Sequence, residues 1–189
     1  MSDHTKQLLL GLLSAAILGG ALYAMLNVVP LLLRDLGTPA HLERPIKASA
    51  FSLRDADGQD FTLDGERGKI VVLLFWTSWN EVALEAVHRM NEYRSSLSPE
   101  VTVLAVNSQE SPEDMSSIFK NSAIPVVFDE NGAVGEAYAI GVLPLTVVID
   151  RSGFVAARHI GLLELSDLEA LLRPLAGNSE NGAAIFSEP

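Results

Sequence analysis

Hydrophobic and polar positions follow two different patterns along this chain. Residues 7–33 carry no charged side chain and are mostly apolar. Beyond residue 48, short apolar runs such as 71–76 alternate with segments in which apolar residues recur every three or four positions. A continuous apolar run of this length predicts a strand buried on both faces, and the spaced recurrences predict amphipathic helices. The pattern therefore predicts one membrane segment followed by one α/β domain.

The charge-free segment is long enough to cross a bilayer. A transmembrane helix needs about 20 apolar residues, and we assign residues 8–33 to an anchor that follows a short tail, residues 1–7. A cleaved signal peptide is the competing interpretation, but its apolar core usually spans only about 7–15 residues. Gly11, Ala15 and Gly19 form a stripe of small residues. Such a stripe is typical of a helix that packs on a partner helix, although Gly and Ala are common in membrane helices generally.

The charges that flank the anchor leave its orientation open. Lys6 precedes the anchor, whereas Arg34, Arg44 and Lys47 follow it. Taken alone, the positive-inside rule would place the domain in the cytoplasm. The rule discriminates poorly with so few charges, and acidic residues lie among them.

Turn residues and apolar runs divide the rest of the chain into predicted elements. A polar, proline-bearing linker at residues 34–47 leads into a domain at residues 48–174, and a polar tail at residues 175–189 is predicted to be disordered. We expect a mixed central sheet with helices on both faces and a β-hairpin at the start of the domain. The predicted strands are 51–53, 61–63, 71–76, 101–106, 125–128, 145–150 and 154–159, and the predicted helices are 83–94, 112–120, 133–138 and 165–172.

Composition and charge narrow the functions that the domain can have. The net charge is −11 and no cluster of Lys and Arg occurs. Nucleic acid is therefore not an expected partner, because phosphate binding relies on clustered basic side chains. The chain has no cysteine, which excludes disulfides, thiolate metal sites and dithiol exchange.

Several stretches of the domain resemble, in order, the landmarks of the thioredoxin-like TlpA/ResA family. They are residues 51–58 (FSLRDADG), 68–79 (GKIVVLLFWTSW), 103–107 (VLAVN), 124–129 (IPVVFD), 137–146 (AYAIGVLPLT) and 148–153 (VIDRSG). The resemblance implies a thioredoxin-like fold, an N-terminal anchor in the bacterial inner membrane and a domain on its periplasmic or extracytoplasmic side. Active members of the family reduce disulfides, often in cytochrome c maturation.

The chain departs from this family at the reactive positions. Family members carry cysteine at the positions of Asn80 and Ala83, and commonly glutamate and proline at those of Ala86 and His88. The four positions of the cysteine motif read Asn80-Glu81-Val82-Ala83 here. This segment is a vestigial active site without a catalytic residue, because dithiol exchange needs one sulfur to attack and another to resolve the mixed disulfide. Asn is among the best residues at a helix N-cap, so we expect Asn80 to begin a helix.

A proline downstream completes the resemblance to a peptide-binding site. Pro144 matches the family's cis-proline, which faces the active-site helix and presents a backbone edge to extended substrate peptide. X–Pro bonds tolerate the cis form far better than other peptide bonds, and an ordinary trans proline is the alternative. We therefore predict a peptide or partner groove formed by Trp79, Asn80, Leu143 and Pro144, which would bind by strand addition.

One further group of side chains has the spacing of a metal site. Glu81, Glu85 and His88 would share one face of the predicted helix. Solvated surface positions explain them better than metal ligation does. No phosphate loop or nucleotide fingerprint appears, so we expect no metal, cofactor or small-molecule substrate.

These observations favour a binding or structural role. Our leading hypothesis is a membrane-anchored, redox-inactive thioredoxin-like domain that belongs to a larger bacterial membrane complex, with other membrane subunits as partners. The alternative is a non-catalytic accessory protein or chaperone of thiol-disulfide exchange or cytochrome c biogenesis. Both hypotheses predict that the chain is not an enzyme.

Overall fold

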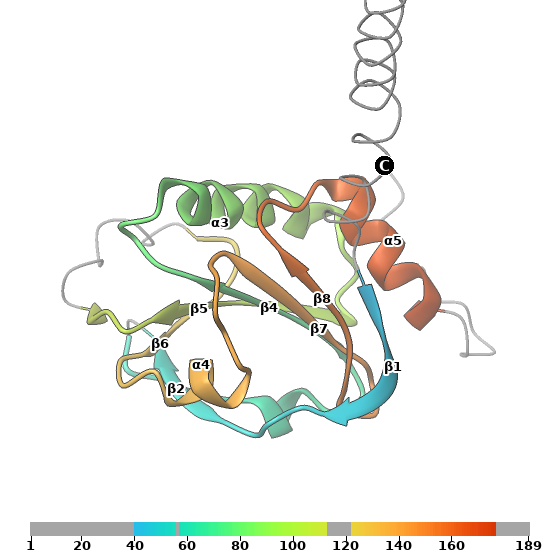
Figure 1. The fold of residues 1–189 in the computed structure, drawn as a ribbon, viewed down its shortest axis with the longest axis horizontal. Helices are drawn as coiled ribbons and strands as arrows, with labels where there is room; N and C mark the ends of the chain where they lie inside the picture. Colours follow the sequence, from blue (N-terminus) through green and yellow to red (C-terminus); the bar gives the residue numbers. More distant parts are fainter. Residues whose placement is uncertain (1–39, 56, 113–121, 177–189) are drawn as a thin grey trace, which may run out of the picture. The chain divides into compact units, whose positions relative to one another are not determined.

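The computed structural model describes residues 40–55, 57–112 and 122–176, which form one mixed β-sheet flanked by helices (Figure 1). Strands lie in the sheet in the order β1-β8-β7-β4-β5-β6-β2-β3. The strands are β1 (Ala40–Lys47), β2 (Ser52–Asp55), β3 (Asp60–Thr62), β4 (Ile70–Trp76), β5 (Val101–Ser108), β6 (Val126–Asp129), β7 (Leu145–Ile149) and β8 (Phe154–Ile160).

The central strands confirm the mixed sheet that the apolar runs predicted. β4 pairs parallel with β5 and antiparallel with β7, and β5 pairs parallel with β6. Every residue of β4 is buried. A strand covered on both faces needs apolar side chains in both directions, which is why the run at 71–76 shows no polar alternation.

Helices cover both faces of the sheet, as predicted. Helix α3 (Glu81–Tyr93) and helix α5 (Leu165–Ala176) lie on one side, and the short helix α4 (Ala133–Ala137) lies on the other (Figure 1). The predicted helix at 112–120 lies, apart from Pro112, outside the described residues.

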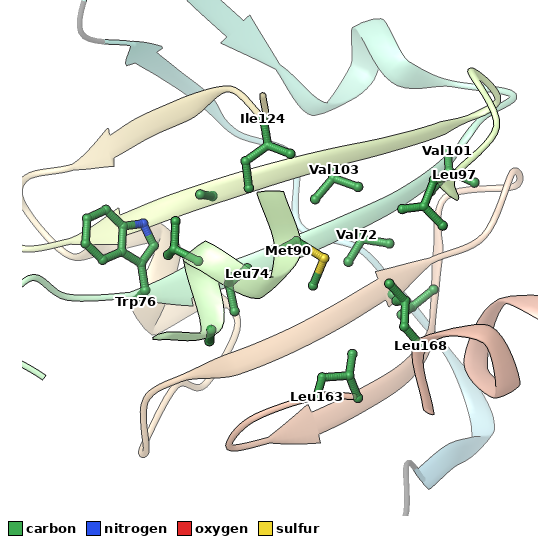
Figure 2. Packing of buried hydrophobic residues seen from close by; sticks show 14 of the residues in the cluster. Val72, Leu74, Trp76, Met90, Leu97, Val101, Val103, Ile124, Leu163 and Leu168 are labelled. Atoms are coloured by element: carbon green, nitrogen blue, oxygen red, sulfur yellow. The ribbon is translucent and has the colours of Figure 1, made fainter. Parts of the chain in front are cut away.

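The core under α3 leads directly to the predicted site. Met90 of α3 packs over Val72 and Leu74 of β4, and Trp76 lies at the end of this cluster nearest the start of the helix (Figure 2). The Met90 and Trp76 side chains are almost fully buried. Burial of a large apolar side chain stabilises the fold by roughly 1.5–3 kcal/mol, so this cluster fixes α3 on the sheet.

The first strands of the domain lie at opposite edges of the sheet. The predicted hairpin is confirmed as β2 and β3, and β2 pairs with β6. Residues 40–47, which we assigned to the linker, instead form β1 and pair with β8. Pro45 obscures a strand pattern, but an edge strand or a bulge tolerates its missing N–H. The pairing shifts register between His41 and Ile46 accordingly.

The end of the domain also differs from its predicted boundary. Helix α5 continues to Ala176, past its predicted end at residue 172 and into the segment assigned to the tail. Pro174 predicted an earlier stop, because a proline inside a helix removes the hydrogen bond to the carbonyl four residues before it, yet the helix continues through this position. Leu175 packs on the core, and its carbonyl accepts a hydrogen bond from Arg151 Nη1 at 2.5 Å.

Two predicted segments are not described by the structure. The anchor at 8–33, with its stripe Gly11, Ala15 and Gly19, and residues 177–189 of the tail lie outside the described residues. Within residues 40–55, 57–112 and 122–176, no helix has the length and apolar character needed to span a bilayer. The anchor and its stripe stay predictions.

Candidate functional site

The loop between β4 and α3 brings the vestigial motif to the surface. Trp76 and Thr77 are buried, Ser78 and Asn80 are half-buried, and Trp79 is 74% exposed. The largest side chain of the loop therefore faces solvent. A Trp in this position contributes little to the core and is free to contact another molecule.

Asn80 caps α3 and also contacts the proline loop. Its Oδ1 accepts hydrogen bonds from the backbone N–H groups of Val82 at 3.0 Å and Ala83 at 3.2 Å, which confirms the predicted N-cap. Its Nδ2 donates to the Leu143 carbonyl at 3.2 Å. The tertiary structure thus brings together two of the predicted groove residues from segments far apart in the sequence.

The proline loop is held firmly at both ends. The Leu143–Pro144 bond is cis, and the buried Pro144 accepts a hydrogen bond at its carbonyl from Gly161 N at 2.9 Å. At the other end, Arg158 Nη2 donates to the Tyr138 carbonyl at 2.7 Å. The Tyr138 hydroxyl donates to the Ser49 carbonyl at 2.9 Å, and burial raises the pKa of this phenol to about 12.

The backbone between these two ends is open. Among the described residues, the N–H groups of Gly141, Val142 and Leu143 find no hydrogen-bond acceptor, and the carbonyls of Gly141 and Val142 find no donor. Unpaired backbone groups of this kind are the template that strand addition uses. This stretch, Gly141–Leu143, is called the open edge below.

Exposed apolar side chains gather around the open edge. Four of the five large apolar residues that the described structure exposes lie here, and only Ile46 lies elsewhere. They share this end of the sheet because β4 ends, β7 begins and β8 ends at the same place. The four are Trp79 (74% exposed), Val82 (48%), Val142 (57%) and Ile160 (60%), and they form the apolar rim of the site.

The carboxylate of Glu110, a residue that the sequence patterns did not single out, holds the loop between β4 and α3 in place. It accepts hydrogen bonds from Ser78 N at 2.7 Å, Ser78 Oγ at 2.5 Å and Asn107 Nδ2 at 2.7 Å. Hydrogen bonds to a charged acceptor are stronger than neutral ones. The sequence could have indicated Glu110, because it closely follows β5. The carboxyl ends of the parallel strands β4 and β5 meet at one edge of the sheet, which places residues that follow them near each other.

The positions of the family's chemistry are filled by small apolar side chains. Ala83 is fully buried and Ala86 is 6% exposed, and both belong to the core under α3. Neither alanine offers an atom that donates, accepts or attacks. With Asn80 engaged as the cap, neither Asn80 nor the two alanines supply a nucleophile or a proton-transfer group.

The helix face that suggested a metal site is solvated. Glu81, Glu85 and His88 are all exposed, and the Glu85 carboxylate pairs with Arg89 Nε at 2.9 Å. Across the part of the chain that the structure describes, no three His, Asp or Glu side chains are grouped so as to hold a metal ion.

Comparison with known proteins places this arrangement in a family. Residues 46–158 match the AhpC/TSA family. Thiol-disulfide oxidoreductase ResA of Geobacillus thermodenitrificans is 31% identical over 131 residues, which cover 68% of this chain and 75% of the relative. ResA of Bacillus subtilis is 32% identical over 133 residues, covering 67% of this chain and 74% of the relative.

Solved structures of similar proteins have the same fold as this chain. A thiol:disulfide interchange protein assigned as DsbE, from Chlorobium tepidum, is 26% identical with a TM-score of 0.61, covering 71% of this chain and 98% of that one. The exposed lipoprotein thioredoxin of Streptococcus pneumoniae is 27% identical with a TM-score of 0.62, covering 67% and 100%. The region that matches the family contains Asn80, the open edge and Pro144, but not Ile160 of the rim. The chain therefore belongs to the AhpC/TSA family, as a thioredoxin-like, ResA-related member that has no cysteine.

Proposed function

We propose that this chain is a redox-inactive, membrane-anchored binding subunit that holds an extended segment of a partner protein at the open edge. In this role the chain would bind through the surface by which a thiol-disulfide oxidoreductase recognises its substrate, but it would not carry out the reaction. Dithiol exchange requires an attacking and a resolving sulfur, and this chain has neither. We accordingly expect no turnover of a disulfide substrate with any dithiol reductant above a protein-free blank.

The observation that carries the proposal is the coincidence of an open backbone edge with an apolar rim. The N–H groups of Gly141, Val142 and Leu143 lack acceptors among the described residues, while Trp79 beside them is 74% exposed. Strand addition uses backbone groups for affinity and side-chain contacts for specificity. Both are available at this one end of the sheet.

Sequence and relatives support the placement of this subunit at a membrane. The charge-free residues 8–33 are long enough for an anchor, and one structural relative is described as an exposed lipoprotein. We propose that the domain lies on the extracytoplasmic side of the bacterial inner membrane and that its partners are other membrane-associated subunits.

A second function fits the family more closely. The relatives named ResA are thiol-disulfide oxidoreductases, so a non-catalytic accessory protein or chaperone could present substrates to such an enzyme, including those of cytochrome c biogenesis. The first function predicts a stoichiometric complex. The second predicts transient capture of thiol proteins or apocytochromes.

Affinity purification of the full-length chain in a mild detergent tests the proposal. Trp79→Ala removes an exposed rim side chain, and Ile46→Ala is the matched control because Ile46 is 55% exposed on β1, away from the site. We expect a stoichiometric partner with the wild type and Ile46→Ala, and its loss with Trp79→Ala. A complex that survives Trp79→Ala intact means that binding does not use this edge. Substoichiometric recovery of thiol proteins would favour the accessory function.

A further inference from the structure

A pocket adjoins the open edge, and Trp79 is not among the residues that line it. It has a volume of about 410 Å³ and lies among the end of β5, the turn between β6 and α4, and the open edge itself. Leu143 belongs to both features, because its carbonyl accepts a hydrogen bond from Asn80 and the residue also lines the pocket. A segment bound along the open edge would therefore pass the mouth of this pocket.

The charged lining of the pocket is entirely acidic. Asp129 and Glu136 line it, and no Lys, Arg or His does. The Asp129 carboxylate is buried and accepts hydrogen bonds from Val134 N at 3.2 Å and Gly135 N at 2.7 Å, which hold α4. Glu136 is exposed and forms no ion pair among the described residues. Its charge is thus uncompensated at the mouth of the pocket.

Neutral polar groups complete the pocket. Gln109 lines it from a left-handed backbone conformation, with φ 61°. Its side chain lies against Gly132, where a Cβ would fall 2.5 Å from Gln109 Nε2. Any residue with a Cβ at position 132 would clash with Gln109, so the glycine there makes room for the Gln109 side chain. Side-chain amides both donate and accept hydrogen bonds, so it is the acidic charge of the lining that suits the pocket to a cationic group.

We infer that this pocket takes a lysine or arginine side chain of the partner segment that the open edge binds. The inference rests on the proposed function and names the chemistry of its partner. Alternate side chains of an extended segment face the same way, about 6.8 Å apart. A partner segment would therefore carry an apolar residue for the rim two positions from a basic residue for the pocket. Charge complementarity with a chain of net charge −11 favours the same partner.

Two matched peptides test the inference with the full-length chain in mild detergent. The probe is fluorescein-labelled Thr-Val-Thr-Lys-Thr-Val-Thr, which presents valine two positions from lysine in either direction of binding, and the control replaces lysine by norleucine. We expect the lysine peptide to bind at least threefold more tightly by fluorescence anisotropy in 50 mM salt, as for a single partly exposed charge pair. The preference should shrink in 500 mM salt because exposed charges are screened.

Two variants test whether the preference for lysine arises in the pocket. Glu136→Gln should abolish the preference for lysine and leave binding of the norleucine peptide unchanged, whereas Glu130→Gln, an exposed carboxylate on the neighbouring turn that does not line the pocket, should retain it. Equal binding of both peptides by the wild type overturns the inference and leaves the proposed function standing. Binding of neither peptide overturns the proposed function and the inference together. A peptide of residues 177–189, which has two glutamates and no basic residue, is the competing occupant, and tighter binding of that peptide also overturns the inference.

Discussion

The outer and inner sides of residues 79–86, at the start of α3, differ sharply. On the outer side Trp79 and Val82 are 74% and 48% exposed, although both are apolar. On the inner side Ala83 and Ala86, at positions where active relatives carry chemistry, are 0% and 6% exposed. The outer side carries large apolar groups that the core does not use, while the inner side is packed as ordinary core.

The difference shows that neighbouring positions at the start of one helix can be subject to separate demands, one set by packing and the other by the surface. Buried positions without a reactive group are under the demands of packing alone, which favour small apolar side chains that leave no unsatisfied polar atom. Exposed apolar side chains gain little from the core, and the partner contact proposed above would account for them. The following substitutions sharpen or break the comparison.

The largest effect is expected from a charge placed on the inner side. Ala83→Glu would bury an unpaired carboxylate in a site with no free space, and we expect it to lower the free energy of unfolding by at least about 4 kcal/mol. Val82→Glu, one residue away on the outer side, should change it by less than about 0.5 kcal/mol. Urea unfolding of the full-length chain measures both. Similar losses in the two variants would mean that the turn has no distinct inner and outer sides.

The next effect concerns the support beneath the loop. Glu110→Ala removes the shared acceptor of Ser78 and Asn107, and we expect the free energy of unfolding to fall by about 2–3 kcal/mol, because the part-buried N–H and hydroxyl of Ser78 lose their charged acceptor. The control is Glu130→Ala, an exposed carboxylate with no hydrogen bond to this loop. Equal stability of Glu110→Ala and the wild type would show that the loop holds its conformation without this carboxylate.

A smaller effect is expected at the cap. Asn80→Ala removes the acceptor for Val82 N and Ala83 N and should cost about 1 kcal/mol. Asn80→Asp keeps an acceptor and places a negative charge where the helix dipole favours it, so it should lose only the hydrogen bond to the Leu143 carbonyl. The same urea experiment distinguishes the two. Equal losses would assign the energy to the Leu143 contact instead of the cap.

The smallest effect on stability is expected at the rim. Trp79→Ala should leave the free energy of unfolding within about 0.5 kcal/mol of the wild type, since the side chain is exposed. The same substitution is expected to remove the partner in affinity purification. A large loss of stability would show that Trp79 stabilises the fold. The outer side would then contribute to stability as the inner side does.

Much of the fold was predictable because its signals are local. The continuous run at 71–76 predicted a doubly covered strand, and the structure confirms it as β4. The apolar spacing from Ala83 to Met90 predicted the buried face of α3, and Asn80 predicted its start. β1 was not predictable in this way, since a charged, proline-containing edge strand lacks the apolar pattern of a central one.

The sequence by itself determined that the chain has no cysteine, and so neither of the two thiols that dithiol exchange uses to attack and to resolve a mixed disulfide. It also determined which segments are core strands and helices, through apolar periodicity. Only the tertiary structure decided what lies beside the vestigial motif: Asn80 reaches the Leu143 carbonyl, and Glu110 reaches Ser78. Only the tertiary structure placed β1 and the β2–β3 hairpin at opposite edges of the sheet. Such contacts join residues far apart in the sequence, and they depend on strand pairing that local patterns do not encode.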